Sequence, residues 1–396
     1  MLHTSPITTR FGAPMLTTVH PALYSFRRAL ARLIVCSAWA MCLGTSVASA
    51  QAIVRDPAAR PFSITRFDPA LDALIAPNAK LKAVAAGFGF SDGPVWVRGR
   101  NGAEGYLLAV SIIGNVIYKV TATGNVSVFL DRAGYTGSDF AHTGKLALIA
   151  RIHMILIGPN CTGVDRQGRV IWCAGQDRAL MRLESNGTRT VLATGFEGKR
   201  FNGPNDVAIA HDGTIYFSDS DVGLRGGIDG GLAQMPDSVW RWKEGKVTLA
   251  VTRNELGAEP NGIALSPDDK YLYLSAGTGS PDPKMVRYRV KAAGVLGPGE
   301  LFTHGRGIGD GMKADSRGNI YSSDGPLGIV RITSPTGRPL GLLHLPTRGE
   351  AEPQKAICAS ALAFGGDDAR TLYITACDVI YALRLKTAGI LEGPPR

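Results

Sequence analysis

Apolar and polar positions along this chain repeat in a unit of two short strands joined by a tight turn. Each unit begins with small or polar residues and an apolar pair, passes through a turn containing Gly or Asp, and ends in a strand rich in Tyr, Ile and Val. Turns of that composition supply the positive φ angles that hairpins need. Six units recur, starting at Ser91, Cys161, Pro204, Pro260, Asp310 and Ala359. The pattern therefore predicts six β-hairpins.

A second β-like stretch follows most of these hairpins, as at residues 180–192 and 239–251. Two hairpins per unit make a four-stranded blade of roughly 40–50 residues, and blades set around an axis protect most strand edges. No long amphipathic helical pattern appears after residue 50, which argues against an α/β fold. We therefore predict an all-β fold, a six-bladed β-propeller with four-stranded blades, over residues 81–390.

One segment does not fit the repeat. Residues 135–158 contain the apolar run KLALIARIHMILIG between the first and second units. We interpret this run as an insertion that forms an extra strand pair or a short helix over one face of the propeller. The alternative is a longer outer strand of the first blade.

The first fifty residues read differently from the rest. They carry arginines but no acidic residue, then a nearly apolar run over 33–47 and the small residues Ala48, Ser49 and Ala50. That order is typical of a secretory signal peptide, and the run is short for a membrane span. We predict a signal peptide at 1–50, an extension at 51–80 and a periplasmic or secreted protein. An N-terminal anchor left uncleaved is the alternative to our expectation of no stable membrane anchor.

Charge and composition narrow the function classes. The formal net charge is +10, and it falls to +6 without the four arginines of the N-terminal segment. The remaining charges are scattered and form no dense basic block, so we expect no nucleic-acid partner. With 45% hydrophobic residues the chain can bury a large core, and we expect a monomer.

Four cysteines follow the predicted signal peptide, an even number for an oxidising compartment. Cys161 opens one predicted hairpin and Cys173 closes it, while Cys358 and Cys377 do the same in the last unit. Facing positions on paired strands can lie close enough for a disulfide. We predict bridges 161–173 and 358–377, with four buried free thiols as the alternative.

The innermost strand of each blade lines the channel of a propeller, so the polar residues that open each unit should meet at one mouth. These residues are Asp92, Asn160, Asn205, Asp206, Asn261 and Asp310. Carboxylate and amide oxygens suit a hard divalent cation, and the absence of His and Cys ligands favours calcium over zinc or copper. We predict one divalent cation, calcium first, with zinc, manganese or magnesium as alternatives. Taken singly, each residue could instead be a turn residue bonded to its own backbone.

Five motifs occur in order at blade spacing: GPVW after Asp92, N-x-P-N-D followed by DGTIYFSD, PNGIALSPDDKYLY, DGMKAD followed by GNIY, and AFGGDDARTLYITA. Over residues 80–386 these motifs resemble the gluconolactonase family, which includes senescence marker protein (regucalcin) and luciferin-regenerating enzyme. The resemblance implies a six-bladed propeller that hydrolyses lactones and holds one divalent ion on its axis.

The same resemblance implies metal ligands at Asp92, Asn205, Asn261 and Asp310, and it places Asn160 near the substrate. The family normally has Glu where this chain has Asp92. It also has Gly and Asn where this chain has Cys161 and Ala361. These departures lie around the predicted mouth, which leaves room for a substrate other than gluconolactone.

We therefore predict a metal-dependent hydrolase that opens a sugar lactone or a related lactone or ester. Asp310 would be the catalytic general base, and Asn160 and Asp206 would orient substrate or water. The chain has no G-x-S-x-G nucleophile elbow, which argues against a serine hydrolase. The alternatives are a phosphotriesterase-like hydrolase and a non-catalytic periplasmic propeller that binds sugar or calcium.

Overall fold

The structure, a computed structural model, describes residues 61–138, 145–149, 152–224, 233–278, 280–346 and 358–394. Contacts divide the chain into two units, Met1–Pro57 and Ala58–Arg396, and only the second contains described residues. The predicted signal peptide at 1–50 therefore lies outside the described residues. No helix within the described ranges is long and apolar enough to cross a membrane.

The described residues form an all-β fold. Four short helical turns accompany the strands: η1 (Pro69–Ala73), η2 (Asp221–Gly223), α2 (Arg253–Leu256) and η3 (Ala292–Gly294). Three sheets have four strands each. The first consists of β8 (Pro159–Val164), β9 (Val170–Ala174), β10 (Ala179–Leu183) and β11 (Arg189–Ala193), and the second of β14 (Pro204–Ile209), β15 (Ile215–Asp219), β16 (Ser238–Lys243) and β17 (Lys246–Thr252). The third consists of β18 (Pro260–Leu265), β19 (Tyr271–Ala276), β20 (Lys284–Val290) and β21 (Leu296–His304). Each of the three runs in chain order from an inner to an outer strand.

Two larger sheets complete the fold. One has five strands: β1 (Ser63–Arg66), β25 (Pro339–His344), β24 (Ile329–Thr333), β23 (Ile320–Asp324), β22 (Met312–Ala314). The other has six: β26 (Ala361–Gly365), β27 (Thr371–Arg384), β2 (Leu81–Val97), β3 (Tyr106–Ser111), β4 (Val116–Thr121), β5 (Val126–Asp131). A further small ribbon pairs β12 (Gly195–Phe196) with β13 (Lys199–Arg200).

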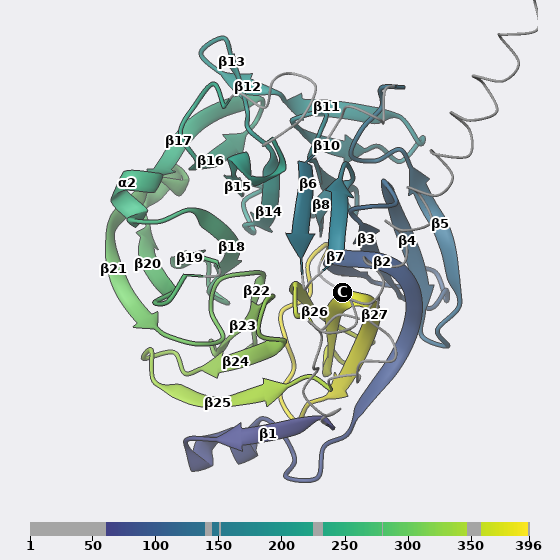
Figure 1. The fold of residues 1–396 in the computed structure, drawn as a ribbon, viewed down its shortest axis with the longest axis vertical. Helices are drawn as coiled ribbons and strands as arrows, with labels where there is room; N and C mark the ends of the chain where they lie inside the picture. Colours follow the sequence, from purple (N-terminus) through teal and green to yellow (C-terminus); the bar gives the residue numbers. More distant parts are fainter. Residues whose placement is uncertain are drawn as a thin grey trace, which may run out of the picture. The chain divides into compact units, whose positions relative to one another are not determined.

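All six predicted hairpins are confirmed as antiparallel pairs: β2/β3, β8/β9, β14/β15, β18/β19, β22/β23 and β26/β27. The first strands of these hairpins contact one another in the closed order β2, β8, β14, β18, β22, β26 and back to β2. The sheets consequently follow one another around a common centre, which is the arrangement of a β-propeller (Figure 1).

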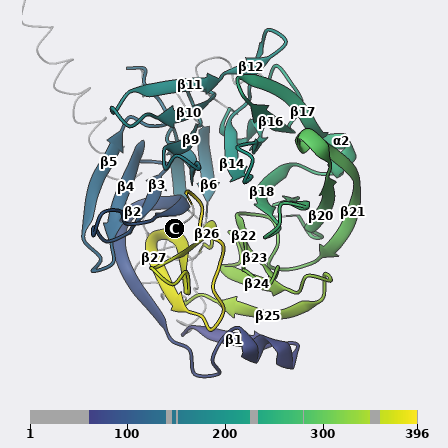
Figure 2. The same cartoon turned by 180° about the vertical axis from the view of Figure 1, so that it is seen from behind.

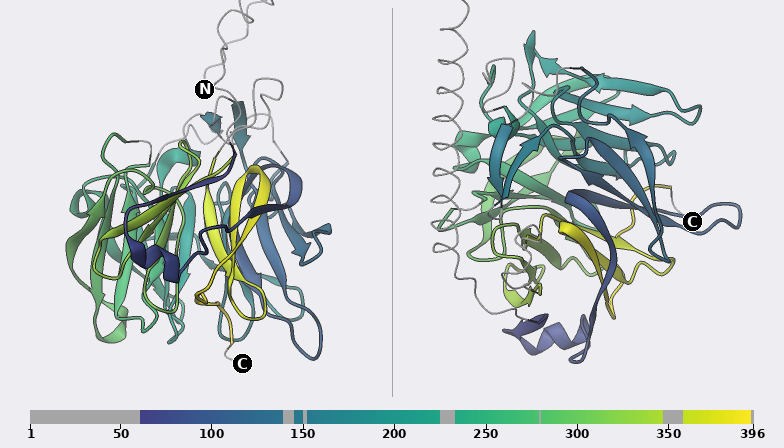
Figure 3. Two further views of the ribbon diagram at one scale, coloured as in Figure 1. Left: turned by 90° about the horizontal axis from the view of Figure 1, so that it is seen from below. Right: turned by 45° about the vertical axis from the view of Figure 1, so that its right-hand side comes forward.

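The prediction of six blades, each with four strands, is wrong in its count. The described residues form five sheets of four to six strands, because the last hairpin and the first share one hydrogen-bonded sheet. The first part of β2 pairs with β27 and the last part pairs with β3. Figure 3 shows the C-terminal strands of this sheet, in yellow, beside its N-terminal strands, in blue.

The segment β27 doubles back within this sheet. Its flanking residues meet, because the Leu385 N–H donates to the Arg370 carbonyl at 2.8 Å. Fourteen residues in one extended strand would instead separate the two ends by roughly 45 Å. Cys377 has a positive φ of 53°, which suits a tight turn in the middle of this segment.

The predicted extension at 51–80 contributes to the sheets where it is described. β1 pairs with the outer edge of β25 (Figure 2), and the turn that follows buries Leu71, Leu74 and Ile75 against Leu343. Edge strands of sheets are prone to pair with other chains, so β1 covers one such edge.

The insertion contains a strand pair, one of the two forms that the sequence left open. β6 (Lys145–Ile149) and β7 (Ile152–Leu156) form an antiparallel ribbon of their own, and not an outer strand of the first blade. Residues 139–144 and 150–151 of the same segment lie outside the described residues.

Both predicted disulfides are present. Cys161 and Cys173 are bonded with their Cα atoms 5.0 Å apart, and Cys358 and Cys377 with theirs 5.5 Å apart. All four residues are buried in the core. The four cysteines are therefore not free thiols, which settles the alternative.

Candidate active site

The site begins at a local irregularity that four inner strands share. Hairpin register shifts at the same place in each, between Asp92 and Val95, Pro159 and Thr162, Pro204 and Val207, and Pro260 and Ile263. Such bulges bend a strand and re-aim a side chain, and they are common beside active sites. The polar residue of each unit stands at this bulge, so the irregularity directs it away from the regular pleat.

A Pro-Asn pair opens three of these strands, as Pro159-Asn160, Pro204-Asn205 and Pro260-Asn261. Proline has no N–H to donate, so it is suited to the first residue of a strand. The recurrence of this pair in three units is a sequence signal for the site that the hairpin pattern alone did not use.

These bulges surround a cavity of about 340 Å³. Five of the six predicted polar residues line it, and they come from five strands or strand starts: Asp92, Asn160, Asn205, Asn261 and Asp310. They span more than 200 positions of sequence, and the closed order of the inner strands brings them together.

Glycines that follow the polar residues let the inner strands approach closely. A Cβ on Gly262 would lie 2.1 Å from the Asp310 carbonyl oxygen, and a Cβ on Gly93 would lie 2.3 Å from that of Asn160. No side chain fits at such distances. Asn261-Gly262 is therefore part of strand β18 and not a turn pair.

Asp206 is the residue that the structure does not bring to the cavity. Its Oδ1 accepts the Val207 N–H at 2.7 Å, and its Oδ2 accepts the Ile263 N–H of the next inner strand at 2.9 Å. Asn205 and Asp206 both lie in the register shift between Pro204 and Val207, and only Asn205 lines the cavity. The predicted contact with substrate does not match this placement, because the carboxylate joins β14 to β18.

The carboxylates near the cavity repel one another in a buried setting. Burial raises the pKa of Asp92 to about 8, and the nearby Asp206 adds to the shift. Burial, followed by the charges of Asp92, Asp206 and Asp324, raises the pKa of Asp310 well above its usual range. Buried like charges of this kind are costly unless a positive charge compensates them.

Asn261 carries an oxygen with no partner. Its Nδ2 donates to Thr278 Oγ1 at 3.0 Å, whereas its Oδ1 is buried and accepts no hydrogen bond. Within the described ranges, no three His, Cys, Asp or Glu side chains group closely enough to hold a metal. Any cation bound here would therefore need amide oxygens such as this one among its ligands.

The same inner strands lead to a second, smaller cavity of about 80 Å³ at their other end. Its lining includes the ends of the strands that open at the first cavity, among them Val164, Ile209, Leu265 and Ala314. The C-terminal segment Leu391–Gly393 lies against these strand ends. The two cavities thus occupy opposite ends of one axis.

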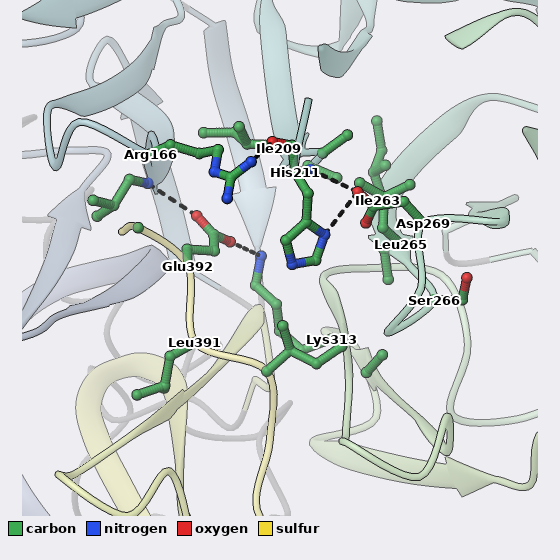
Figure 4. A pocket seen from close by; sticks show the side chains of 17 residues that line it. Arg166, Ile209, His211, Ile263, Leu265, Ser266, Asp269, Lys313, Leu391 and Glu392 are labelled. Carbon is green, nitrogen blue, oxygen red and sulfur yellow. Dashed lines mark hydrogen bonds and ion pairs between the residues drawn. The ribbon is translucent and has the colours of Figure 1, made fainter. Parts of the chain in front are cut away.

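A charged pair stands in this second cavity (Figure 4). Lys313 Nζ lies 3.2 Å from Glu392 Oε1, and Glu392 Oε2 accepts the Val164 N–H at 3.0 Å. Burial lowers the pKa of Lys313, but the charges of Glu392 and Asp206 outweigh burial and raise it overall. The motif DGMKAD contains this lysine, yet the sequence does not indicate its partners, which lie far along the chain.

A closed ring of β-hairpins surrounds a cavity lined by two carboxylates and four side-chain amides, which defines a β-propeller with an oxygen-lined cavity between its inner strands. Residues 90–378 match the family model described as the SMP-30/Gluconolactonase/LRE-like region. The chain belongs to this family.

Relatives of known name agree with this assignment. The chain is 30% identical over 344 residues to a gluconolactonase of Zymomonas mobilis, which covers 82% of this chain and 87% of the relative. A solved gluconolactonase structure from Xanthomonas campestris matches with a TM-score of 0.65 and 26% identity, covering 84% of this chain and 99% of that chain. The calcium-binding regucalcin from Agrobacterium tumefaciens shares the fold, with a TM-score of 0.56 and 17% identity over 85% of this chain and 98% of that chain.

Proposed function

We propose that this protein is a lactone hydrolase that opens its substrate at the cavity bearing Asp92 and Asp310. Family membership supports the reaction class, since relatives of this chain are named gluconolactonase. The observation that carries the proposal is the convergence of buried carboxylates and amides at one end of the axis. The product of such a reaction is the open-chain hydroxy acid.

We propose that the cavity holds one divalent cation, with calcium as the first choice. The donor set fits, because Asn261 presents a buried oxygen without a partner and two buried carboxylates stand among like charges. The residues that would hold the ion are Asp92, Asn205, Asn261 and Asp310. When bound, such an ion supplies Lewis-acid polarisation of a carbonyl and compensates developing negative charge.

Asp310 is the general base of the proposed reaction. Its carboxylate lines the cavity beside the amides, where it can accept a proton from a water. It takes a proton from a water whose oxygen forms a bond to the lactone carbonyl carbon. The ring C–O bond then breaks, and the proton passes to the departing ring oxygen. Asn160 lines the same cavity and orients the substrate through its amide.

We further infer that the six-stranded sheet contributes two blades. Three observations support a count of six: the closed order of six inner strands, the doubling back of β27, and the register breaks of β2. On this interpretation the last blade consists of β26, the two halves of β27 and the first part of β2.

We also propose that the protein is exported to the periplasm or secreted. The two disulfides support this, because structural disulfides persist mainly in oxidising compartments. N-terminal sequencing of the protein isolated from the periplasm or medium should start near residue 51. A mature protein that begins at Met1 and remains with the membrane fraction would favour the uncleaved anchor.

The test of activity follows acid release from lactones with a pH indicator, before and after removal of metal by a chelator. We expect activity to be lost with chelator and restored by calcium, and zinc, manganese and magnesium are added in parallel. Asp310→Asn should abolish turnover, whereas Asp282→Asn, an exposed partner of His304, should leave it unchanged. Full activity in the Asp310 variant would overturn its role as base.

The rival functions are separated with the same preparations. Fluoride or phenol release from organophosphates without any lactone opening would favour a phosphotriesterase. Tight calcium binding without turnover of either substrate class would favour a binding protein.

Asn261→Ala should weaken calcium binding by about tenfold or more in calorimetry, with the exposed Asn186→Ala as control.

A further inference from the structure

The cavity has an apolar side that the proposed reaction does not use. Its apolar lining is formed by Phe90, Ile112, Leu156, Val222 and Pro326, with the disulfide-bonded Cys358. Phe90 and Ile112 are almost fully buried, so they form a fixed wall and not a mobile rim. Leu156 ends the inserted ribbon at β7, and Val222 stands in the turn η2. Apolar side chains from several separate segments of the chain therefore line the same side of the cavity.

Among the lining residues that the structure describes, the two side-chain hydroxyls already make hydrogen bonds within the protein. Ser220 Oγ donates to Glu259 Oε1 at 2.6 Å and accepts the Val222 N–H at 3.1 Å. Thr278 Oγ1 accepts from Asn261 and donates to the Gly309 carbonyl. Both hydroxyl protons are committed, so neither hydroxyl can donate to a ligand.

The two amides outside the proposed ligand set are also committed in part. Asn160 Nδ2 donates to the Pro204 carbonyl at 3.1 Å, and Gln176 Nε2 donates to the Leu156 carbonyl at 3.1 Å. A sugar lactone carries several hydroxyl groups, and each one buried without a partner weakens binding. A site that selects such a substrate needs polar groups aimed at those hydroxyls.

We propose that the preferred substrate is a lactone bearing an alkyl or aryl substituent, and not a polyhydroxylated sugar lactone. This inference rests on the proposed lactone hydrolysis. The lactone ring lies toward Asp92 and Asp310, and the substituent lies against Phe90, Ile112 and Val222. Transfer of the substituent from water to this wall drives binding.

The first experiment compares kcat/KM for δ-lactones of increasing alkyl length with that for glucono-δ-lactone. We expect kcat/KM to rise by about fourfold per methylene until the wall is covered. We also expect the longer alkyl lactones to exceed glucono-δ-lactone by about tenfold or more. Equal or better turnover of glucono-δ-lactone would overturn this inference and leave the proposed lactone hydrolysis intact.

A binding experiment decides the inference even if neither lactone class is opened. Calorimetry compares the affinity for an alkyl-substituted δ-lactam with that for gluconolactam, because binding of a lactam can be measured without any turnover. Tighter binding of the alkyl lactam supports the apolar wall, and tighter binding of gluconolactam overturns it. Absence of lactone opening in the kinetic assay would refute the proposed function separately.

Val222→Thr tests the wall itself, because threonine has nearly the same shape and adds one hydroxyl. We expect a loss of about fivefold in kcat/KM for alkyl lactones and no loss for glucono-δ-lactone. The matched control is Val191→Thr on the outer strand β11, where the side chain is exposed, and it should change neither. An equal loss on both substrates would mean that Val222 acts only on the fold, which contradicts the proposed contact.

Discussion

Lys313 Nζ lies 3.2 Å from Glu392 Oε1 inside the second cavity, where both side chains are more than four-fifths buried. The pair joins the inner strand β22 to the C-terminal segment. Glu392 also accepts the Val164 N–H of the inner strand β8. One carboxylate thus connects two inner strands of the ring to the end of the chain. This contact secures the axis at the end opposite the proposed reaction.

Lys313→Met should destabilise the protein by about 3 kcal/mol, because it leaves Glu392 and Asp206 buried without a positive charge. Urea unfolding measures this change. The control is Lys270→Met, whose partner Asp268 is exposed, and it should cost less than about 1 kcal/mol. If both variants unfolded at the same urea concentration, the pair would have no structural role.

Gly262→Ala should disturb the cavity through the backbone of Asp310. The new Cβ would stand 2.1 Å from that residue's carbonyl oxygen, so β18 and the start of β22 must separate. We expect a cost of about 1–3 kcal/mol and a larger loss of lactone turnover. Gly297→Ala is the control, since its Cβ would lie 3.3 Å from the flexible end of the Lys291 side chain and no closer than 3.5 Å to the Arg289 carbonyl oxygen. Wild-type turnover in the Gly262 variant would show that this close approach does not position Asp310.

Asp219→Asn should change how stability depends on pH. Burial raises the pKa of Asp219 to about 7, although it accepts the N–H groups of Asn202 and Gly203 at 2.9 and 2.7 Å. The stability that its raised pKa provides is fully present below about pH 4 and is lost as pH rises toward 7. Asparagine does not titrate. The wild type should therefore lose stability relative to the variant between pH 4 and 7.

Urea unfolding of both proteins at several pH values measures that difference. We expect the gap in unfolding free energy to move by more than about 1 kcal/mol in favour of the variant between pH 4.5 and 8. A gap that stays constant over this range would mean that Asp219 is ionised in the folded protein throughout.

Removal of the bridge between Cys161 and Cys173, 12 positions apart, should lower stability by about 3 kcal/mol, because it frees a loop in the unfolded chain. The double variant Cys161→Ala with Cys173→Ala is compared with the wild type by thermal unfolding under non-reducing conditions. A matching pair of changes at Cys358 and Cys377 should also reduce turnover, because Cys358 lines the cavity. Unchanged unfolding temperatures in both double variants would contradict the stabilising role.

The sequence by itself determined the features that depend on local spacing and turn chemistry. Six hairpins and both disulfides follow from alternation, Gly and Asp turns, and paired cysteine positions, whereas the insertion was left open between a strand pair and a short helix. The repeat also identified Asp92, Asn205 and Asp310 as residues that line one cavity, because each stands near the start of a repeat unit.

Only the tertiary structure decided what depends on register between distant segments. Ser91 pairs with Cys377, 286 positions later, and this pairing merges the first and last hairpins into one sheet. The bulge beside Pro204 determined that Asn205 faces the cavity while Asp206 turns away. The Lys313–Glu392 contact and the apolar wall likewise join segments that no local pattern relates, because ring closure alone brings them together.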